Sequence, residues 1–388
     1  MTSQLKALGT QGQAVWLDFL ERRFLAEGGL ARMIERDGVT GVTSNPSIFE
    51  KAIGHGDAYD EELDALTKGA ERTVSDIYEH LAVADIQDAA DALRPVYDRL
   101  DGADGYVSIE VSPYLSDSTT DTSAEARRLW ATIDRPNLMV KVPGTDAGVP
   151  AVRALTEEGL NINITLLFAI DMYQAVAEAY VAGLEARVAR GEDVSGIASV
   201  ASFFVSRIDA RIDKAIDARV AAGDVETEAL KSLRGTIAIA NAKLAYQHYL
   251  GLIASERWKA LAAKGARPQR LLWASTGTKD VALSDVLYID SLIGRDTIST
   301  IPPGTMDAFR DHGTIAATLT QDVDGARHTL AEAERLDLDL PSVTASLVDE
   351  GIRQFREAYD RLLGAIADRR ATLPSSGSDG HEASPRRG

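Results

Sequence analysis

A lysine at the end of an apolar run is the residue of this sequence with the clearest chemical meaning. Lys141 lies in the run LMVKVPG at positions 138–144, a pattern typical of a buried strand. Lysine is among the residues that are least often fully buried without a partner. An amine in such a place either pairs with a carboxylate or loses its charge and becomes a nucleophile that forms a Schiff base with a carbonyl.

Other apolar runs also end in polar residues, namely Asp18, Asn45, Glu110, Asn163, Thr165 and Ser202. Taken singly, these residues have ordinary explanations. Lys141 and Glu110 would make a structural ion pair, Asn45 before Pro46 suits a turn, and Asp18 suits a helix cap. Burying several polar groups without partners would cost ~1–3 kcal/mol each. Their joint occurrence therefore favours one shared site for a polar substrate.

Short strands alternating with helical patterns must position these side chains. We predict strands at 15–18, 39–45, 106–111, 138–142, 160–165, 197–202, 271–275 and 297–301, with helices such as 168–190 and 205–220 between them. Repeated strand–helix units imply parallel strands joined by right-handed crossovers. Eight such units predict an α/β fold with a single closed (β/α)8 barrel. The main alternative is an open doubly wound sheet, but its glycine-rich nucleotide-binding motifs are missing.

Alternation of side chains along the strands predicts which residues point into the barrel. On 106–111 and 138–142, one face is apolar and the other carries the reactive group. The same pattern holds for 160–165 and 15–18. Because barrel enzymes hold their chemistry at the C-terminal ends of the strands, we expect one mouth to collect five residues: Asp18, Glu110, Lys141, Asn163 and Thr165.

The C-terminal part of the chain departs from this alternation. The sequence PPG at 302–304 breaks the strand–helix pattern, a polar helical stretch covers about 319–336, and a long helix runs from 341 to near 370. Residues 372–388 are rich in Pro, Ser, Gly and charge, which is typical of a disordered tail. We therefore predict one domain, a barrel with additional C-terminal helices, over 1–371 and a disordered tail over 372–388.

Composition limits the function classes. The chain has 388 residues, 45% of them hydrophobic and 26% charged, with no cysteine. It has no apolar run that could span a membrane and no signal-peptide core at its start, so we expect a cytoplasmic protein without a membrane partner. A net charge of −18 argues against nucleic acid binding. The six histidines show no ligand spacing, and we expect no metal.

Five windows of the sequence closely resemble the transaldolase family: GVTSNPSIF at 41–49, SIEV at 108–111, MVKVPGT at 139–145, NINITLLF at 161–168 and SFFVSRID at 202–209. The resemblance runs in order from about 16 to 279 and is nearest to the longer form found in actinobacteria. It implies a class I aldolase barrel and a transferase, and the imine of such a mechanism is itself the electron sink, so we expect no cofactor. We expect a monomer or homodimer.

The reaction that this resemblance implies is reversible transfer of a dihydroxyacetone unit between sugar phosphates. Sedoheptulose 7-phosphate or fructose 6-phosphate would be the donor, and erythrose 4-phosphate or glyceraldehyde 3-phosphate the acceptor, in the non-oxidative pentose phosphate pathway. A close alternative is fructose 6-phosphate aldolase-like activity, which releases free dihydroxyacetone.

The resemblance also implies roles for four catalytic residues. Lys141 matches the lysine that forms the Schiff base. Asp18 matches the general acid/base that takes the proton of the C4 hydroxyl. Glu110 and Thr165 match the pair that holds a catalytic water during formation and dehydration of the carbinolamine.

Substrate-binding residues follow from the same windows. The dihydroxyacetone unit would be held by Asn45, Asn163 and Ser202. Phe204 is expected to wall the site against water, and Arg207 matches a phosphate-binding arginine. The sequence departs from shorter members at WASTGTK, 273–279. There Ser275 is expected to offer a hydroxyl, and Lys279 replaces a second arginine without its bidentate fork.

Two other classes remain open at this point. Asp18 and Glu110 could form the carboxylate pair of a barrel glycosidase. A barrel that binds sugar phosphates without turnover is the second alternative. Neither class needs the lysine, asparagine and threonine set at these strand ends.

Overall fold

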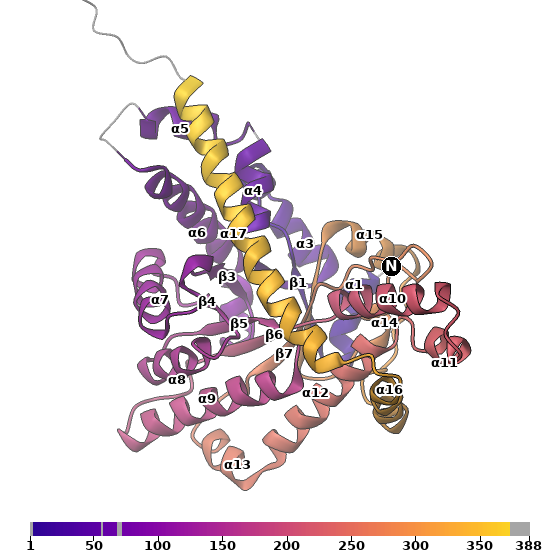
Figure 1. Cartoon of the computed structure of the whole chain (residues 1–388). Coiled ribbons are helices and arrows are strands. Elements are labelled where there is room, and N and C mark those ends of the chain that lie inside the picture. The colour runs from indigo at the N-terminus through magenta and orange to yellow at the C-terminus, as the bar shows by residue number, and fades with distance from the viewer. Residues whose placement is uncertain (1–2, 56, 68–71, 373–388) are drawn as a thin grey trace, which may run out of the picture.

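A closed barrel of eight parallel strands forms the centre of the protein (Figure 1). The structure is a computed structural model, and it describes residues 3–55, 57–67 and 72–372. The strands follow one another around the barrel in chain order, and the last pairs with the first. Their bounds are β1 (Gln13–Leu17), β2 (Val39–Thr43), β3 (Tyr106–Glu110), β4 (Leu138–Pro143), β5 (Ile162–Leu167), β6 (Ser199–Phe204), β7 (Arg270–Ala274) and β8 (Thr297–Ile301). The predicted (β/α)8 barrel is confirmed.

Helices cover the outside of the barrel and extend beyond it at the C-terminal side. Two short 3-10 helices, η1 (Gly9–Gln11) and η2 (Pro113–Leu115), accompany them. The α-helices are α1 (Gln4–Leu8), α2 (Arg22–Ala26), α3 (Gly29–Asp37), α4 (Pro46–His55), α5 (Asp60–Thr67), α6 (Val74–Arg99), α7 (Thr119–Ile133), α8 (Gly148–Glu158), α9 (Ile170–Ala189), α10 (Ser206–Ala221), α11 (Thr227–Ser232), α12 (Ile237–Ala254), α13 (Glu256–Ala262), α14 (Leu287–Ser291), α15 (Pro303–His312), α16 (Val323–Arg335) and α17 (Leu340–Thr372).

The observed strand ends differ from the predicted ones by no more than two residues. β5 shows the reason most clearly. It runs to Leu167 rather than ending at Thr165, and Leu166 has a left-handed φ of 59°. The register with β6 shifts between Ile164 and Leu167. An irregularity of this kind interrupts the alternation of side chains between the two faces of the strand. Strand ends are predicted from that alternation, so the predicted end of β5 was displaced.

One predicted break in the pattern was wrong. The prolines at 302–303 do not end the strand–helix alternation, because α15 begins at Pro303 directly after β8. Proline suits the first turn of a helix, where its missing N–H would have no helical partner. β8 is therefore followed by a helix, as the other strands are.

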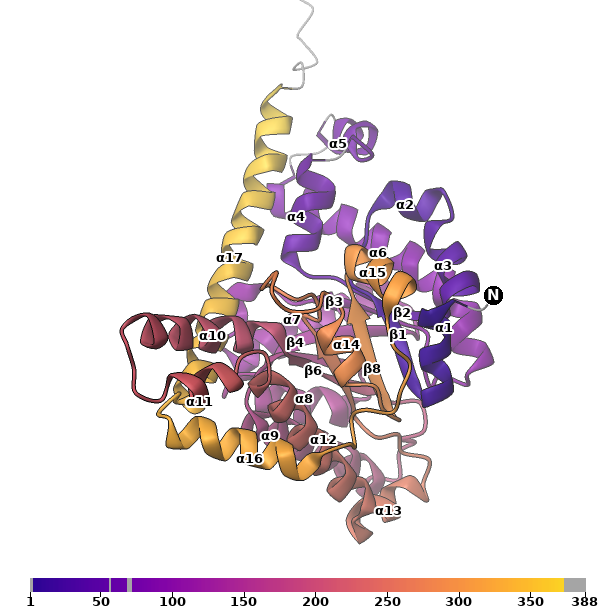
Figure 2. The same cartoon turned by 90° about the vertical axis from the view of Figure 1, so that its right-hand side faces the viewer.

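The long C-terminal helix α17 lies beside the barrel and reaches from α16 to α5 (Figures 1 and 2). It contacts α4, α6, α10 and β5. Its packed side carries Leu347, Phe355, Leu362 and Ile366, all of which are buried. The tail predicted over 372–388 lies outside the described residues, apart from Thr372 at the end of α17.

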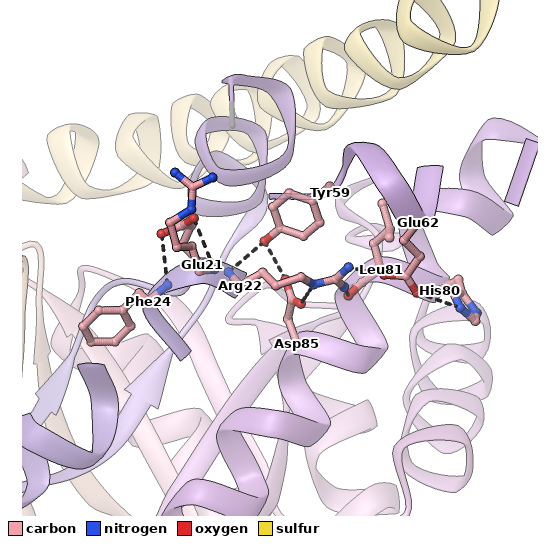
Figure 3. Close-up of polar contacts among 9 residues, drawn as sticks. Glu21, Arg22, Phe24, Tyr59, Glu62, His80, Leu81 and Asp85 are labelled. Atoms are coloured by element: carbon pink, nitrogen blue, oxygen red, sulfur yellow. Dashed lines mark hydrogen bonds and ion pairs between the residues drawn. The ribbon is translucent and has the colours of Figure 1, made fainter. Parts of the chain in front are cut away.

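A buried ion pair anchors the segment that follows β1 (Figure 3). Arg22 donates from Nε to the Asp85 Oδ1 at 2.8 Å, and the Tyr59 hydroxyl donates to the other Asp85 oxygen at 2.6 Å. Arg22 also pairs with Glu62, which His80 approaches at 3.2 Å. The Asp85 side chain has no exposed surface, and its burial raises its pKa despite these partners. The network joins α2, α5 and α6 just beyond Asp18.

Two adjacent arginines offer a matched test of this anchor. Arg22→Met should lower the free energy of unfolding by roughly 3–5 kcal/mol, because it leaves a buried carboxylate without its cation. Arg23→Met should cost less than about 1 kcal/mol, since Arg23 and its partner Asp57 are both exposed. Chemical denaturation of the two variants measures the difference, and equal costs would contradict the anchoring role.

Candidate active site

The Lys141 amine lies inside the barrel, next to a carboxylate on the neighbouring strand. In the register of the sheet, Glu110 of β3 pairs with Lys141 of β4, which pairs with Asn163 of β5. The Lys141 side chain is 6% exposed. Its Nζ donates to the backbone carbonyl of Ser44 at 3.2 Å and lies 4.0 Å from the Glu110 Oε2. The amine is thus held in place without a close salt bridge.

Glu110 and Thr165 each present a buried oxygen with no hydrogen-bond partner among the described residues: the Oε2 of Glu110 and the Oγ1 of Thr165. Burial raises the pKa of Glu110 to about 7, although Lys141 and Arg207 act in the opposite direction. A carboxyl group with a pKa near neutrality can both donate and accept a proton at physiological pH. Such a group beside an amine suits a reaction in which protons move in both directions.

A cavity of about 670 Å³ opens at the C-terminal ends of the strands and contains most of the predicted site residues. Eight of them line it: Asp18, Asn45, Lys141, Ser202, Phe204, Arg207, Ser275 and Lys279. Glu110, Thr165 and Asn163 do not line this cavity. Across 3–55, 57–67 and 72–372, no group of three or more His, Asp or Glu side chains is placed to hold a metal ion.

Asp18 follows β1 directly and is oriented by a threonine of the next strand. The Thr43 hydroxyl lies 2.7 Å from the Asp18 Oδ1 and 2.7 Å from the Thr300 hydroxyl of β8. The Asp18 backbone N–H donates to the carbonyl of Ile301 at 3.0 Å. One Asp18 oxygen therefore has a neutral partner, and the side chain remains at the cavity wall as a potential base.

Asn163 and Asn45 were predicted to share one role, binding of the dihydroxyacetone unit, but their surroundings in the structure differ. Asn163 is fully buried, and both ends of its amide are bonded: Nδ2 donates to Ser108 at 3.0 Å, and Oδ1 accepts from Ser202 at 2.7 Å. Asn45 lines the cavity, and its Oδ1 accepts the Ile48 N–H at 3.0 Å at the start of α4. Asn45 thus forms the expected turn and also lines the cavity.

Three cations gather on one side of the cavity, although the chain has a net charge of −18. The Arg207 guanidinium carbon lies 5.3 Å from the centre of the Phe204 ring. Lys279 lines the same cavity, and burial together with the nearby Arg207 lowers its pKa. Lys51 of α4 is the third cation. This grouping, with Ser275 beside it, favours an anionic part of the substrate.

Sequence reasoning missed residues that reach the site from distant elements. Gln354 of α17 accepts a hydrogen bond from Arg207 at 3.1 Å, and Glu350 fixes the Gln354 amide by accepting from its Nε2 at 2.9 Å. No local pattern connects positions so far apart in the chain. Lys51 was detectable in principle, since it lies on α4, less than two helical turns after Asn45.

Comparisons with known proteins give a consistent result. The profile of the family described as "Transaldolase/Fructose-6-phosphate aldolase" matches residues 15–366. A transaldolase of Thiobacillus denitrificans is 50% identical over 361 residues, which cover 93% of this chain and 99% of that protein. Transaldolases of Trichodesmium erythraeum and Thermobifida fusca are 45% and 46% identical, covering 95% and 96% of this chain and 98% and 99% of theirs.

The raised pKa of Glu110 predicts a pH-dependent contribution to stability. An unfolded glutamate loses its proton near pH ~4.3, whereas the folded protein keeps the Glu110 proton until pH reaches about 7. Between these values the folded state binds the extra proton, so this contribution falls as pH rises. As pH rises from 5 to 8, the free energy of unfolding of Glu110→Gln should therefore increase by roughly 1–3 kcal/mol relative to that of wild type.

Urea denaturation at the two pH values measures this difference. Glu27→Gln, at an exposed position of the same residue type, serves as the control. A difference between Glu110→Gln and wild type that stays constant with pH would show that the carboxyl group ionises normally in the folded protein.

Proposed function

The chain belongs to the transaldolase/fructose-6-phosphate aldolase family, and we propose that it is a transaldolase whose Schiff base forms on Lys141. It transfers a dihydroxyacetone unit from sedoheptulose 7-phosphate to glyceraldehyde 3-phosphate, giving erythrose 4-phosphate and fructose 6-phosphate. This is a step of the non-oxidative pentose phosphate pathway. The observation that carries the proposal for Lys141 is a buried amine at the wall of a cation-lined cavity, 4.0 Å from Glu110.

Imine formation uses the amine and the neighbouring acid. The Lys141 nitrogen attacks the C2 carbonyl of the donor, and the carbinolamine that results loses its hydroxyl as water. Overall, the amine, the ketone and one proton give an iminium ion and one water molecule. Glu110 supplies that proton and takes it back when the imine is hydrolysed. Its free Oε2 and the free Thr165 Oγ1 support a water held between them.

Cleavage of the carbon–carbon bond uses Asp18 as the base. Asp18 takes the proton of the C4 hydroxyl, the C4 oxygen forms an aldehyde, and the electrons of the C3–C4 bond move into the iminium group. The three-carbon unit stays on Lys141 until the acceptor aldehyde enters. Ser202, Asn45 and Asn163 are proposed to hold its hydroxyls, directly or through the bonded Asn163–Ser202 pair. Phe204 would keep water from the carbanion.

The anionic end of each sugar is proposed to lie at the three cations. Arg207, Lys279 and Lys51 line one cavity with Lys141, and Ser275 adds a hydroxyl. Because the partner of Arg207 is the neutral Gln354, its positive charge remains available to a phosphate. Lys279 attracts a phosphate as a point charge rather than as a planar fork.

Reductive trapping tests the Schiff base. Borohydride added to enzyme and fructose 6-phosphate should attach a three-carbon or six-carbon adduct to Lys141, and peptide mapping by mass spectrometry locates it. Lys141→Met should abolish both the adduct and the activity, whereas Lys214→Met, at an exposed lysine of α10, should keep both. An adduct on another lysine would contradict the proposed role of Lys141.

The second activity in the family description, aldol cleavage with release of dihydroxyacetone, is the alternative. We expect transfer to predominate, because α17 helps to cover the cavity through Phe355 and so protects the bound carbanion. With fructose 6-phosphate as donor, sedoheptulose 7-phosphate should form from erythrose 4-phosphate much faster than free dihydroxyacetone appears without an acceptor. Equal rates would identify the aldolase activity instead.

Location and assembly stay predictions. No helix within the described ranges is long and apolar enough to cross a membrane. We propose a cytoplasmic enzyme that acts on sugar phosphates as a monomer or homodimer. The hydrolase suggested by Asp18 and Glu110 is set aside, since the family carries out aldol chemistry.

A further inference from the structure

A second cavity, of about 290 Å³, is lined by Glu110. It extends between α6, α7 and α17 and is lined by Glu110, Ser75, Tyr78, Glu79, Arg128 and Tyr359 among others. Ser75 and Arg128 are exposed at its outer end, whereas the Glu110 side chain is only 3% exposed at its inner end. The cavity therefore leads from the protein surface to the catalytic carboxyl group.

Glu110 and Lys141 line different cavities. Lys141 lines the larger cavity and not the second one, while Glu110 lines the second one and not the larger. Their charged atoms are nevertheless 4.0 Å apart. Asn45 lines both cavities. The amine thus faces the sugar, and the acid that serves it faces a separate space.

Tyr78, Tyr359 and Ser75 line the second cavity together with Glu110. The Tyr78 ring packs edge-on against Tyr359 and Phe49, with ring centres 5.5 and 5.9 Å apart. The Tyr359 hydroxyl lies 3.2 Å from the Ser75 hydroxyl at the outer end. Among the described residues, the Tyr78 hydroxyl has no hydrogen-bond partner, so it is free to bond water in the cavity. Burial, Tyr359 and Glu110 raise the pKa of Tyr78, and its hydroxyl therefore keeps its proton.

Such a route would serve transfer through an imine. Each imine formed consumes one proton and releases one water molecule, and each hydrolysis reverses both. These exchanges must occur beside Glu110 while a sugar phosphate fills the larger cavity. Bulk water entering through the larger cavity would also protonate the carbanion. A separate water path to Glu110 resolves this conflict.

We propose that the second cavity holds a chain of water molecules that carries protons and water between Glu110 and solvent, with the Tyr78 hydroxyl as its fixed link. Tyr78 is a positioning residue: it acts through Glu110 and does not touch the sugar. The inference rests on the proposed Schiff-base function.

Oxygen exchange at C2 isolates the steps that use this path. Fructose 6-phosphate is incubated with enzyme in ¹⁸O-labelled water without an acceptor, and mass spectrometry follows the label beyond the rate without enzyme. Tyr78→Phe should slow enzyme-catalysed exchange about tenfold, a fraction of a full acid–base contribution because Glu110 remains. The KM for fructose 6-phosphate should not change, since the larger cavity is intact.

Tyr106→Phe is the matched control. Tyr106 lies on β3 with Glu110 but at the opposite end of the strand, and its hydroxyl donates to the Gly102 carbonyl rather than lining the second cavity. Its loss should lower stability without changing exchange. Ala82→Leu gives an independent test, because Ala82 lines the second cavity and the larger side chain would fill part of it. Ala82→Leu should also slow exchange.

The outcomes separate this inference from the proposed function. If borohydride traps wild type on Lys141 but exchange is unchanged in both Tyr78→Phe and Ala82→Leu, the water path is wrong and the Schiff base stands. If Tyr106→Phe slows exchange as much as Tyr78→Phe, the effect is merely structural and the inference also fails. If wild type gives no adduct, the proposed function itself is wrong.

Discussion

Burial of the Lys141 amine within the barrel is the constraint on which the rest of the site depends. A charged amine removed from water is costly, and so is a carboxylate beside it. The structure meets this cost in part: Nζ donates to one backbone carbonyl, while Glu110 remains 4.0 Å away with a pKa raised to about 7. A tight salt bridge would hold both groups in their charged forms. The looser pair leaves room for a proton to be shared through a water molecule.

The barrel places the two members of this pair, Glu110 and Lys141, in the walls of two different cavities. Neighbouring strands β3 and β4 carry Glu110 and Lys141 at the same level, yet the two side chains line different cavities. The sugar chemistry proposed for this protein uses the larger cavity, which Asp18 and the cations line. Proton and water exchange are assigned to the smaller one. The long helix α17 contributes to both, through Phe355 in the first and Tyr359 in the second.

The positive charge of the larger cavity comes from a few residues, although the whole protein has a net charge of −18. Most arginines of the described chain are paired with carboxylates, but Arg207 is bonded to the amide of Gln354. Glu350, which could have neutralised it, is occupied by Arg211 and by Gln354 itself. The positive charge at the cavity is thus preserved by the choice of a neutral partner. An acidic surface elsewhere does not prevent this arrangement, because charges separated by more than a Debye length in salt are largely screened.

The closed barrel was predictable from local sequence patterns, because its strands and helices alternate along the chain. Side-chain alternation is a local property, so the repeated pattern that ends in Lys141, Glu110 and Asp18 could be read from short windows. It could not show that the Asn163 amide is already bonded at both ends, since Ser108 and Ser202 belong to other strands. The positions of Gln354 and Tyr78, and the separation of Glu110 and Lys141 into two cavities, follow from the packing of distant elements. Each depends on side chains from elements that are not neighbours in the chain, such as Gln354 of α17 and Arg207 of α10, and no local period records which of them will meet.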